Sequence, residues 1–90
     1  MEDPPRRPPR LRERLAYTGH ARDQMRQRQV TEADIEFVLA NYDIHRPAPS
    51  RGAAKPAEIY VGEARGRRLK VYIERGSNPR KVKTAAWEGD

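Results

Sequence analysis

The clearest hydrophobic pattern in the chain is helical and lies between positions 30 and 42. Four apolar residues there follow the i, i+3, i+4, i+7 spacing of one buried helical face, namely Ile35, Val38, Leu39 and Tyr42. Thr31 precedes the run as a capping residue, and Asp34 follows three positions later as an acidic form of the capping box. The pattern predicts a helix from Thr31 to Asn41 or Tyr42.

A weaker helical pattern comes before this one. Ala21 and Met25 lie four residues apart, and the Thr18 hydroxyl can cap a helix that runs to about Gln29. Leu11 and Leu15 have the same spacing. Either a short helix or an extended lead-in is therefore expected before Thr18.

The second half of the chain changes to the period of two that is typical of strands, over residues 58–63, 68–74 and 81–87. In the middle segment Leu69, Val71 and Ile73 share one face, and Arg68, Lys70 and Tyr72 share the other. In the last segment Val82 and Thr84 are expected on one face, opposite Lys83, Ala85 and Trp87. Residues 64–67 and 75–79 contain turn formers, so neighbouring antiparallel hairpins are expected.

The first hairpin leaves its register open between two turns. A two-residue turn at Arg65-Gly66 would place Ile59 and Val61 on the face opposite Leu69, whereas a three-residue turn would align all three. The three-residue turn is preferred because it gives the helices a continuous apolar floor. The predicted fold is α+β, with two N-terminal helices on one face of a small antiparallel sheet of three to four strands. The fourth would be a short edge strand at 43–46, within a loop spanning 43–56.

The N-terminal segment has a different composition from the rest. Residues 1–10 contain four prolines and no aliphatic residue after Met1, so they cannot bury enough apolar surface to order themselves. Residues 1–14 are predicted to form a disordered basic arm, and residues 15–90 a single domain.

Charge and composition narrow the class of protein. The net charge is +6, and arginines predominate among the 19 basic residues, which fits a nucleic-acid partner or coding bias alone. The absence of cysteine excludes disulfides, zinc ribbons and thiol nucleophiles. The longest apolar run, residues 37–40, is far shorter than the roughly 20 residues of a membrane-spanning helix. A cytoplasmic protein without a membrane partner is expected.

Several short motifs resemble a known family. The residues His20-Ala21-x-x-x-Met25-x-x-Arg28-x-Val30-Thr31-x-x-Asp34-Ile35-x-x-Val38-Leu39 resemble the opening signature of the domain of unknown function 4258 family. Residues 67–71 and 82–87 resemble its strand motifs, so the resemblance covers about residues 16–88. That family in turn resembles the RelE/ParE-like toxins. The resemblance implies a RelE-like fold, RNA or the ribosome as target, an acidic antitoxin as partner, and RNA cleavage without metal or cofactor.

Metal-free RNA cleavage needs a base for the 2′-hydroxyl, cations for the phosphorane and an acid for the leaving 5′-oxygen. His20 lies at the start of a predicted helix, where the dipole favours a neutral imidazole, so it is the candidate proton shuttle. Its alternative role is that of a capping or packing histidine. Arg68 and Lys70 are the candidate phosphate ligands. Alternatively, they belong to an ordinary solvated face and pair with Glu63 and Glu74.

Other candidates would contact the RNA around these groups. Thr84 would donate to phosphate, Tyr72 would stack on a base, and Lys83 would contact RNA beside Trp87. Arg28 is a candidate RNA ligand, with a structural role at the turn between the helices as the alternative. His45 lies in a proline-bounded loop and is expected only to be exposed. No metal-ligand spacing and no Gly-rich phosphate loop occurs.

The expected function is therefore that of a toxin-like ribonuclease in which His20, Arg68, Lys70 and Thr84 carry the chemistry. One alternative is a module of the same fold that binds nucleic acid or protein without cleavage. Another is a domain whose sheet edge pairs with a second chain. The ribonuclease hypothesis requires His20 to lie close to Arg68 and Lys70. The sequence does not indicate an oligomeric state.

Overall fold

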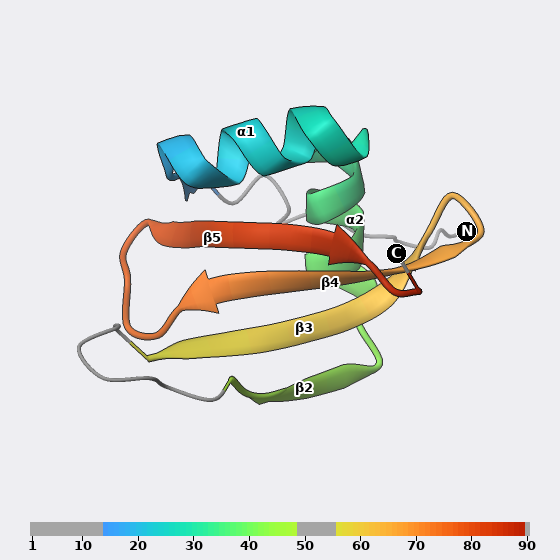
Figure 1. Cartoon of the computed structure of the whole chain (residues 1–90). Coiled ribbons are helices and arrows are strands. Elements are labelled where there is room, and N and C mark those ends of the chain that lie inside the picture. The colour runs from blue at the N-terminus through green and yellow to red at the C-terminus, as the bar shows by residue number, and fades with distance from the viewer. Residues whose placement is uncertain (1–13, 49–55, 90) are drawn as a thin grey trace, which may run out of the picture.

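Two helices pack on one face of a five-stranded mixed sheet in the computed structural model, which describes residues 14–48 and 56–89 (Figure 1). In chain order the elements are β1 (Leu15–Tyr17), α1 (Gly19–Arg28), α2 (Glu32–Asn41), β2 (Ile44–Pro47), β3 (Ala57–Ala64), β4 (Arg67–Glu74) and β5 (Arg80–Trp87). The strand order in the sheet is β1-β5-β4-β3-β2. The predicted α+β class and the two helices are confirmed.

The predicted sheet was too small and wrong in one pairing. β1 adds a fifth strand, and it runs parallel to β5, with Leu15 opposite Arg80. The other three pairings are antiparallel. A strand of three residues is too short to show a period of two, and its partner lies at the other end of the chain. Local pattern therefore allowed an extended lead-in but not its pairing.

Both helices begin where their caps were predicted. The Thr18 hydroxyl accepts a hydrogen bond from Ala21 N at 2.9 Å, and the Thr31 hydroxyl accepts one from Asp34 N at 3.1 Å. α1 ends at Arg28, and the capping residue Gln29 has a φ of 59° that takes the chain out of the helix.

The β3–β4 hairpin has the two-residue turn, so the preference for a three-residue turn was wrong. Arg65 and Gly66 have φ values of 53° and 77°, as a type I′ turn requires, and Ala64 lies opposite Arg67. Ile59 and Val61 consequently lie on the outer face, away from the helices, where they are nevertheless buried. Gly62 lies on the helix side instead, and a Cβ atom there would lie 3.1 Å from Tyr42 Cα. The close approach of the chain after α2 thus favours a glycine over a large apolar side chain.

A β-bulge in β5 changes the faces predicted for this strand. Tyr72 pairs with Thr84 and Ile73 pairs with Val82, so Lys83 is an extra residue. Val82 is therefore buried in the core with Ala85 and Trp87, and Thr84 lies on the outer face. A bulge shifts the alternation by one residue, and for this reason Lys83 and Trp87 do not share a face as predicted.

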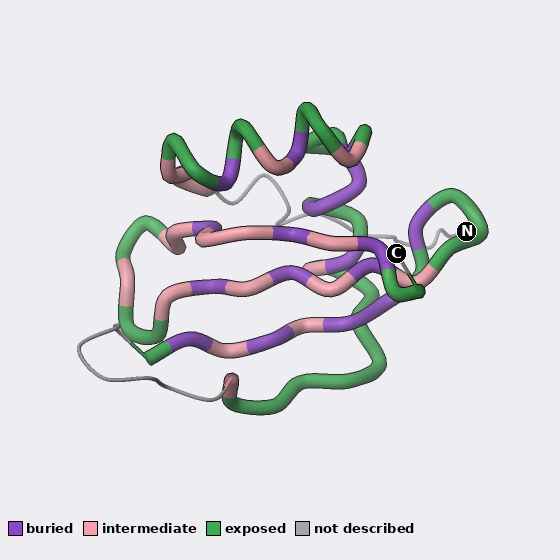
Figure 2. The backbone as a smooth tube through the Cα atoms, viewed as in Figure 1, coloured by how far each residue is buried: buried purple, intermediate pink, exposed green. Residues whose placement is uncertain are grey.

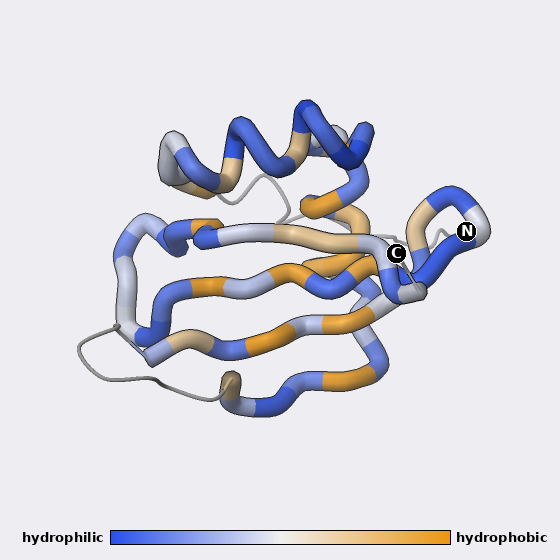
Figure 3. Tube along the Cα trace, viewed as in Figure 1, coloured by the Kyte–Doolittle hydropathy of each residue, from blue (hydrophilic) through white to orange (hydrophobic). Residues whose placement is uncertain are grey.

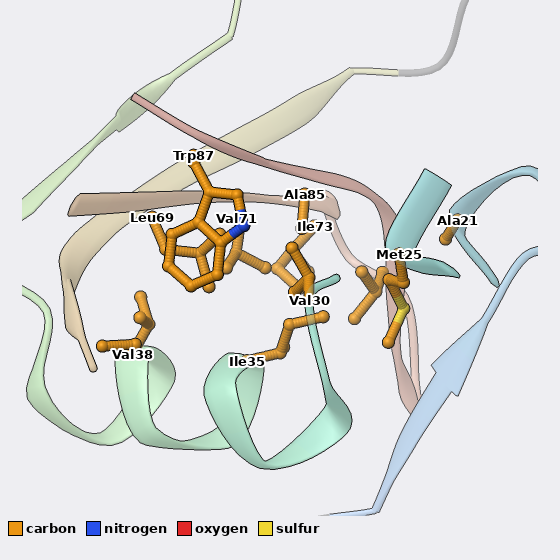
Figure 4. Packing of buried hydrophobic residues seen from close by; sticks show 12 residues of the cluster. Ala21, Met25, Val30, Ile35, Val38, Leu69, Val71, Ile73, Ala85 and Trp87 are labelled. Carbon is orange, nitrogen blue, oxygen red and sulfur yellow. The ribbon is translucent and has the colours of Figure 1, made fainter. Parts of the chain in front are cut away.

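The core lies between the helices and the inner face of β3, β4 and β5 (Figures 2, 3 and 4). Ala21 and Met25 come from α1, Ile35 and Val38 from α2, and the sheet contributes residues such as Val71. The Trp87 ring is buried here, and its Nε1 donates a hydrogen bond to the Arg28 carbonyl at 2.8 Å. Within residues 14–48 and 56–89, no helix is long and apolar enough to cross a membrane.

Candidate functional site

The predicted catalytic residues lie on opposite sides of the sheet. His20 is exposed in the first turn of α1, and α1 packs on the inner face through Ala21 and Met25. Arg68 and Lys70 alternate with core residues of β4 and therefore lie on the outer face. The structure does not bring His20 to these two cations.

Three of the predicted site residues do lie together on the outer face. Tyr72 lies directly opposite Thr84, and Lys70 occupies the next outward position on β4. Arg68 is on the same face, but both of its terminal nitrogens donate to Asp43 at 2.8 Å. This bidentate bond lowers the pKa of Asp43 and raises that of Arg68.

Arg28 and Lys83 are placed differently from these three. Arg28 Nη1 donates to the Ala85 carbonyl at 2.9 Å, which ties α1 to β5. This bond supports a structural role for Arg28, the alternative to RNA binding. The bond joins α1 to the sheet, however, and not to the turn between the helices. Lys83 is half-buried at the bulge.

A cluster of three aromatic rings, which the sequence did not predict, lies where β2 meets β3. The hydrogen bond from Ala48 N to the Ala57 carbonyl sets the alternation of this pair of strands. His45 and Tyr60 are then a non-hydrogen-bonded pair, the geometry in which facing side chains come closest. Their rings stack with centroids 4.3 Å apart at an interplanar angle of 11°. Tyr42 meets Tyr60 edge-on at 4.9 Å.

Charged groups surround the stacked rings. The His45 Nε2 atom is hydrogen-bonded to Oε1 of Glu58, and Arg75 Nε donates to Oε2 of the same carboxylate at 3.0 Å. The Arg80 guanidinium lies over the Tyr60 ring, with its Cζ 5.1 Å from the ring centroid. Arg75 and Arg80 come from either side of the turn between β4 and β5. We call this set the β2–β3 cluster: Tyr42, His45, Glu58, Tyr60, Arg75 and Arg80.

The electrostatics of the cluster keep its carboxylate ionised. The hydrogen bond with His45 is the largest effect and lowers the pKa of Glu58; burial opposes it, and the bond from Arg75 lowers the pKa further. The His45 side chain is 40% exposed and that of Glu58 is 24% exposed, so both reach solvent. The cluster therefore combines an accessible imidazole–carboxylate pair with two guanidinium groups and aromatic rings.

The cluster does not have the composition of a metal site. No group of three His, Cys, Asp or Glu residues suited to hold a metal ion occurs in the described part of the chain. The two carboxylate oxygens of Glu58 are instead hydrogen-bonded to nitrogen atoms of His45 and Arg75.

One sequence signal could have pointed to His45. Residues 43–46 were expected to form an edge strand, and an antiparallel partner at 58–63 would place His45 opposite one of its residues. The connection between these two strands is long, however, and the residues of a long loop do not fix the register as a two-residue turn does. The loop predicted at 43–56 lies partly outside the described residues, as does nearly all of the predicted arm.

Fold and site together define a small α+β domain that presents a histidine–glutamate pair and arginines beside an edge strand. A family model described as "Domain of unknown function (DUF4258)" matches residues 17–87. The chain therefore belongs to the DUF4258 family, as its motifs predicted. Comparisons with curated proteins and with solved structures give no match. No finding links the chain to the RelE/ParE-like toxins, so that part of the resemblance stays a prediction.

Proposed function

We propose that this protein cleaves single-stranded RNA without a metal ion, at the β2–β3 cluster. The observation that carries the proposal is the accessible His45–Glu58 pair, whose carboxylate is also bound by Arg75. This pair supplies an imidazole and a carboxylate, two proton-transfer groups in direct contact.

Each step of the reaction has a candidate group in the cluster. The ionised Glu58 carboxylate takes the proton from the 2′-hydroxyl, and the 2′-oxygen attacks the neighbouring phosphorus. Arg75 and Arg80 stabilise the charge that develops on the phosphorane. As the bond from phosphorus to the 5′-oxygen breaks, protonated His45 gives its proton to that oxygen. The products are a 2′,3′-cyclic phosphate and a free 5′-hydroxyl end.

The aromatic rings suit an unpaired substrate. Bases of single-stranded RNA can stack on tyrosine and histidine rings, whereas bases within a duplex are not free to do so. Tyr42 is 43% exposed and meets the edge of the Tyr60 ring, so it offers a stacking surface beside the proposed scissile phosphate.

This proposal moves the proton-shuttle role from His20 to His45 and keeps the reaction class. Toxin activity, a ribosomal target and an acidic antitoxin remain proposals within the same hypothesis. His20 serves as the internal control because it is an exposed histidine on a different element.

The test is cleavage of a fluorescent single-stranded RNA by the purified full-length chain in the presence of EDTA. We expect products that end in a cyclic phosphate, and loss of the rate by about 10²-fold or more in His45→Gln and in Glu58→Gln. His20→Gln should cleave like the wild type. The proposal is overturned if the wild type does not cleave, if EDTA abolishes the activity, or if His45→Gln retains it.

Binding without cleavage is the second candidate, and the stacked rings support it. In that case RNA affinity should survive His45→Gln and Glu58→Gln but fall in Tyr42→Leu, because stacking of a base on tyrosine contributes about 1–3 kcal/mol. Fluorescence anisotropy with the same RNA measures this. Unchanged affinity in Tyr42→Leu would exclude the rings as the binding surface.

A further inference from the structure

The middle of the outer sheet face carries cations and an aromatic ring without acidic residues. One row across the strands contains Arg46, Ile59, Tyr72 and Thr84, and the next row contains Ile44, Val61, Lys70 and Ala86. The carboxylates on this face lie one row beyond on either side, where Glu63 lies opposite Arg68 and Glu74 is bound by Lys81 at 3.7 Å. The two middle rows therefore form a positively charged strip with an apolar floor.

The strip and the β2–β3 cluster meet at one edge strand. His45 and Arg46 are consecutive residues of β2, so their side chains point to opposite faces of the sheet. All four residues of β2 are exposed. Figure 1 shows β2 next to β3 as the last of the described strands at this edge of the sheet. A strand of RNA that crosses this edge would contact the cluster on one side and Arg46 on the other.

The residues of the strip suit the backbone and bases of RNA. Arg46 and Lys70 supply charges for phosphate groups, and the half-buried Tyr72, next to Lys70 on the outer face of β4, supplies a ring for a base. The Thr84 hydroxyl lies beside Tyr72 as a further donor. Arg68 is less suited because Asp43 occupies it.

We propose that this strip, formed by Arg46, Lys70, Tyr72 and Thr84, is a second RNA subsite that holds nucleotides flanking the cleavage point. The inference rests on the proposed function for its link to the β2–β3 cluster. It names the substrate as an unpaired RNA long enough to pass over the β2 edge, in preference to a dinucleotide.

The test compares two substrates, a dinucleotide and an unstructured RNA of about twelve nucleotides. Lys70→Gln and Tyr72→Leu should raise KM for the long RNA by about five- to tenfold and leave its kcat unchanged. Neither variant should change the rate on the dinucleotide. Lys70→Gln should also lower the slope of log affinity against log salt by about 0.7, the value for one phosphate contact on a single strand.

Arg26→Gln is the matched control for loss of one positive charge. Arg26 is an exposed residue of α1 that pairs with Asp23, so it lies away from the strip. This variant should leave KM for the long RNA within twofold of the wild-type value. Circular dichroism and thermal unfolding show whether each variant is folded.

The outcomes separate this inference from the proposed function. Cleavage that depends on His45 but is insensitive to Lys70→Gln and Tyr72→Leu on the long RNA overturns the subsite and leaves the active site standing. Loss of RNA affinity in these variants, without any cleavage by the wild type, supports the strip as an RNA surface and overturns the catalytic proposal. If Arg26→Gln raises KM for the long RNA as much as Lys70→Gln does, the effect comes from net charge alone and the subsite is overturned. If the variants weaken binding of an acidic peptide and not of RNA, the face belongs to a protein partner and the inference fails.

Discussion

Asp34 shows how one buried carboxylate ties a helix cap to a distant turn. The side chain accepts hydrogen bonds from Thr31 N at 2.9 Å and from Arg65 Nε and Nη2 at 2.9 and 2.7 Å. Burial alone would raise the pKa of Asp34, but the bonds from Arg65 and Thr31 outweigh burial and lower it. The capping box was predictable because it is local, whereas Arg65 lies 31 residues away and needed the fold.

We expect Asp34→Asn to lower the free energy of unfolding at pH 7 by about 1–3 kcal/mol, because the Thr31 N–H and the Arg65 guanidinium lose a charged acceptor. The contribution of Asp34 is complete above its unfolded-state pKa, near 3.9, and is lost as pH falls through the lower folded-state value. Urea unfolding between pH 2 and 7 measures both effects. Asp23→Asn, in an exposed pair with Arg26, should change stability by less than about 0.5 kcal/mol, and an equal loss there would contradict this account.

Tyr17 has a buried hydroxyl that finds no hydrogen-bond partner among residues 14–48 and 56–89. Burial, with the nearby charges of Glu32 and Glu36, raises the pKa of Tyr17 to about 12. We expect Tyr17→Phe to raise stability by up to about 1 kcal/mol, because it removes an unsatisfied polar group and keeps the ring beneath Arg22.

The same residue predicts a change at alkaline pH. The unfolded state loses the Tyr17 proton near pH 10 and the folded state only near 12, so the wild type should lose stability as pH rises through this interval. Tyr17→Phe should lose less over the same interval in denaturant unfolding. Tyr42→Phe serves as control, since Tyr42 is exposed, and a Tyr17→Phe variant that is clearly less stable would refute a partnerless hydroxyl.

At the scale of elements, the strands were easier to predict than their pairing. The position of β4 followed from clean alternation, because each strand residue faces one side regardless of its neighbours. Register depended on single residues: one residue fewer in the turn moved Ile59 to the outer face, and one extra residue at Lys83 put Val82 on the same face as Ala85 and Trp87. Such choices are decided by packing across the sheet, which a local pattern does not contain.

Gly62 and Gly19 provide a matched test of the packing between α2 and β3. A Cβ at Gly62 would approach Tyr42 Cα to 3.1 Å, whereas one at Gly19 meets nothing within 4 Å. We expect Gly62→Ala to cost about 1–3 kcal/mol and Gly19→Ala to be neutral or stabilising by about 0.5 kcal/mol. Thermal and urea unfolding of both variants measure the difference. Equal stability of the two would mean that the chain after α2 moves freely away from β3.

The exposed edge of β2 bears on the alternative in which this sheet pairs with another chain. Hydrogen-bonded and non-hydrogen-bonded pairs alternate along β2 and β3. Of the four β2 residues, His45 and Pro47 direct their backbone groups away from the sheet, and Pro47 has no N–H to donate. This edge therefore offers few hydrogen bonds to an added strand. The side chains on its two faces give more support to a ligand that wraps the edge than to a paired strand.

At the scale of the whole molecule, the sequence predicted that the site needs a histidine, cations and an aromatic ring. It did not predict which histidine lies close to the other groups. Lys70 and Tyr72 were expected to share a face, and they do, because alternation along β4 places them there. The bulge in β5 puts Thr84 on the same face, which the sequence pattern did not predict. The role given to His20 depended on a helix and a sheet face coming together, and the helices pack on the other side. His45 and Glu58 became neighbours only through the pairing of β2 with β3.

Expression in a bacterial host separates the two histidines in the setting where a toxin would act. We expect induced full-length protein to arrest growth, because cleavage of cellular RNA stops protein synthesis. His45→Gln at matched protein level should relieve the arrest, and His20→Gln should not. Sequencing of RNA ends from arrested cells should show new 5′-hydroxyl ends in the wild type and in His20→Gln only. Relief by His20→Gln with continued arrest by His45→Gln would return the proton-transfer role to α1 and reduce the β2–β3 cluster to an ion-pair network that holds an edge strand in place.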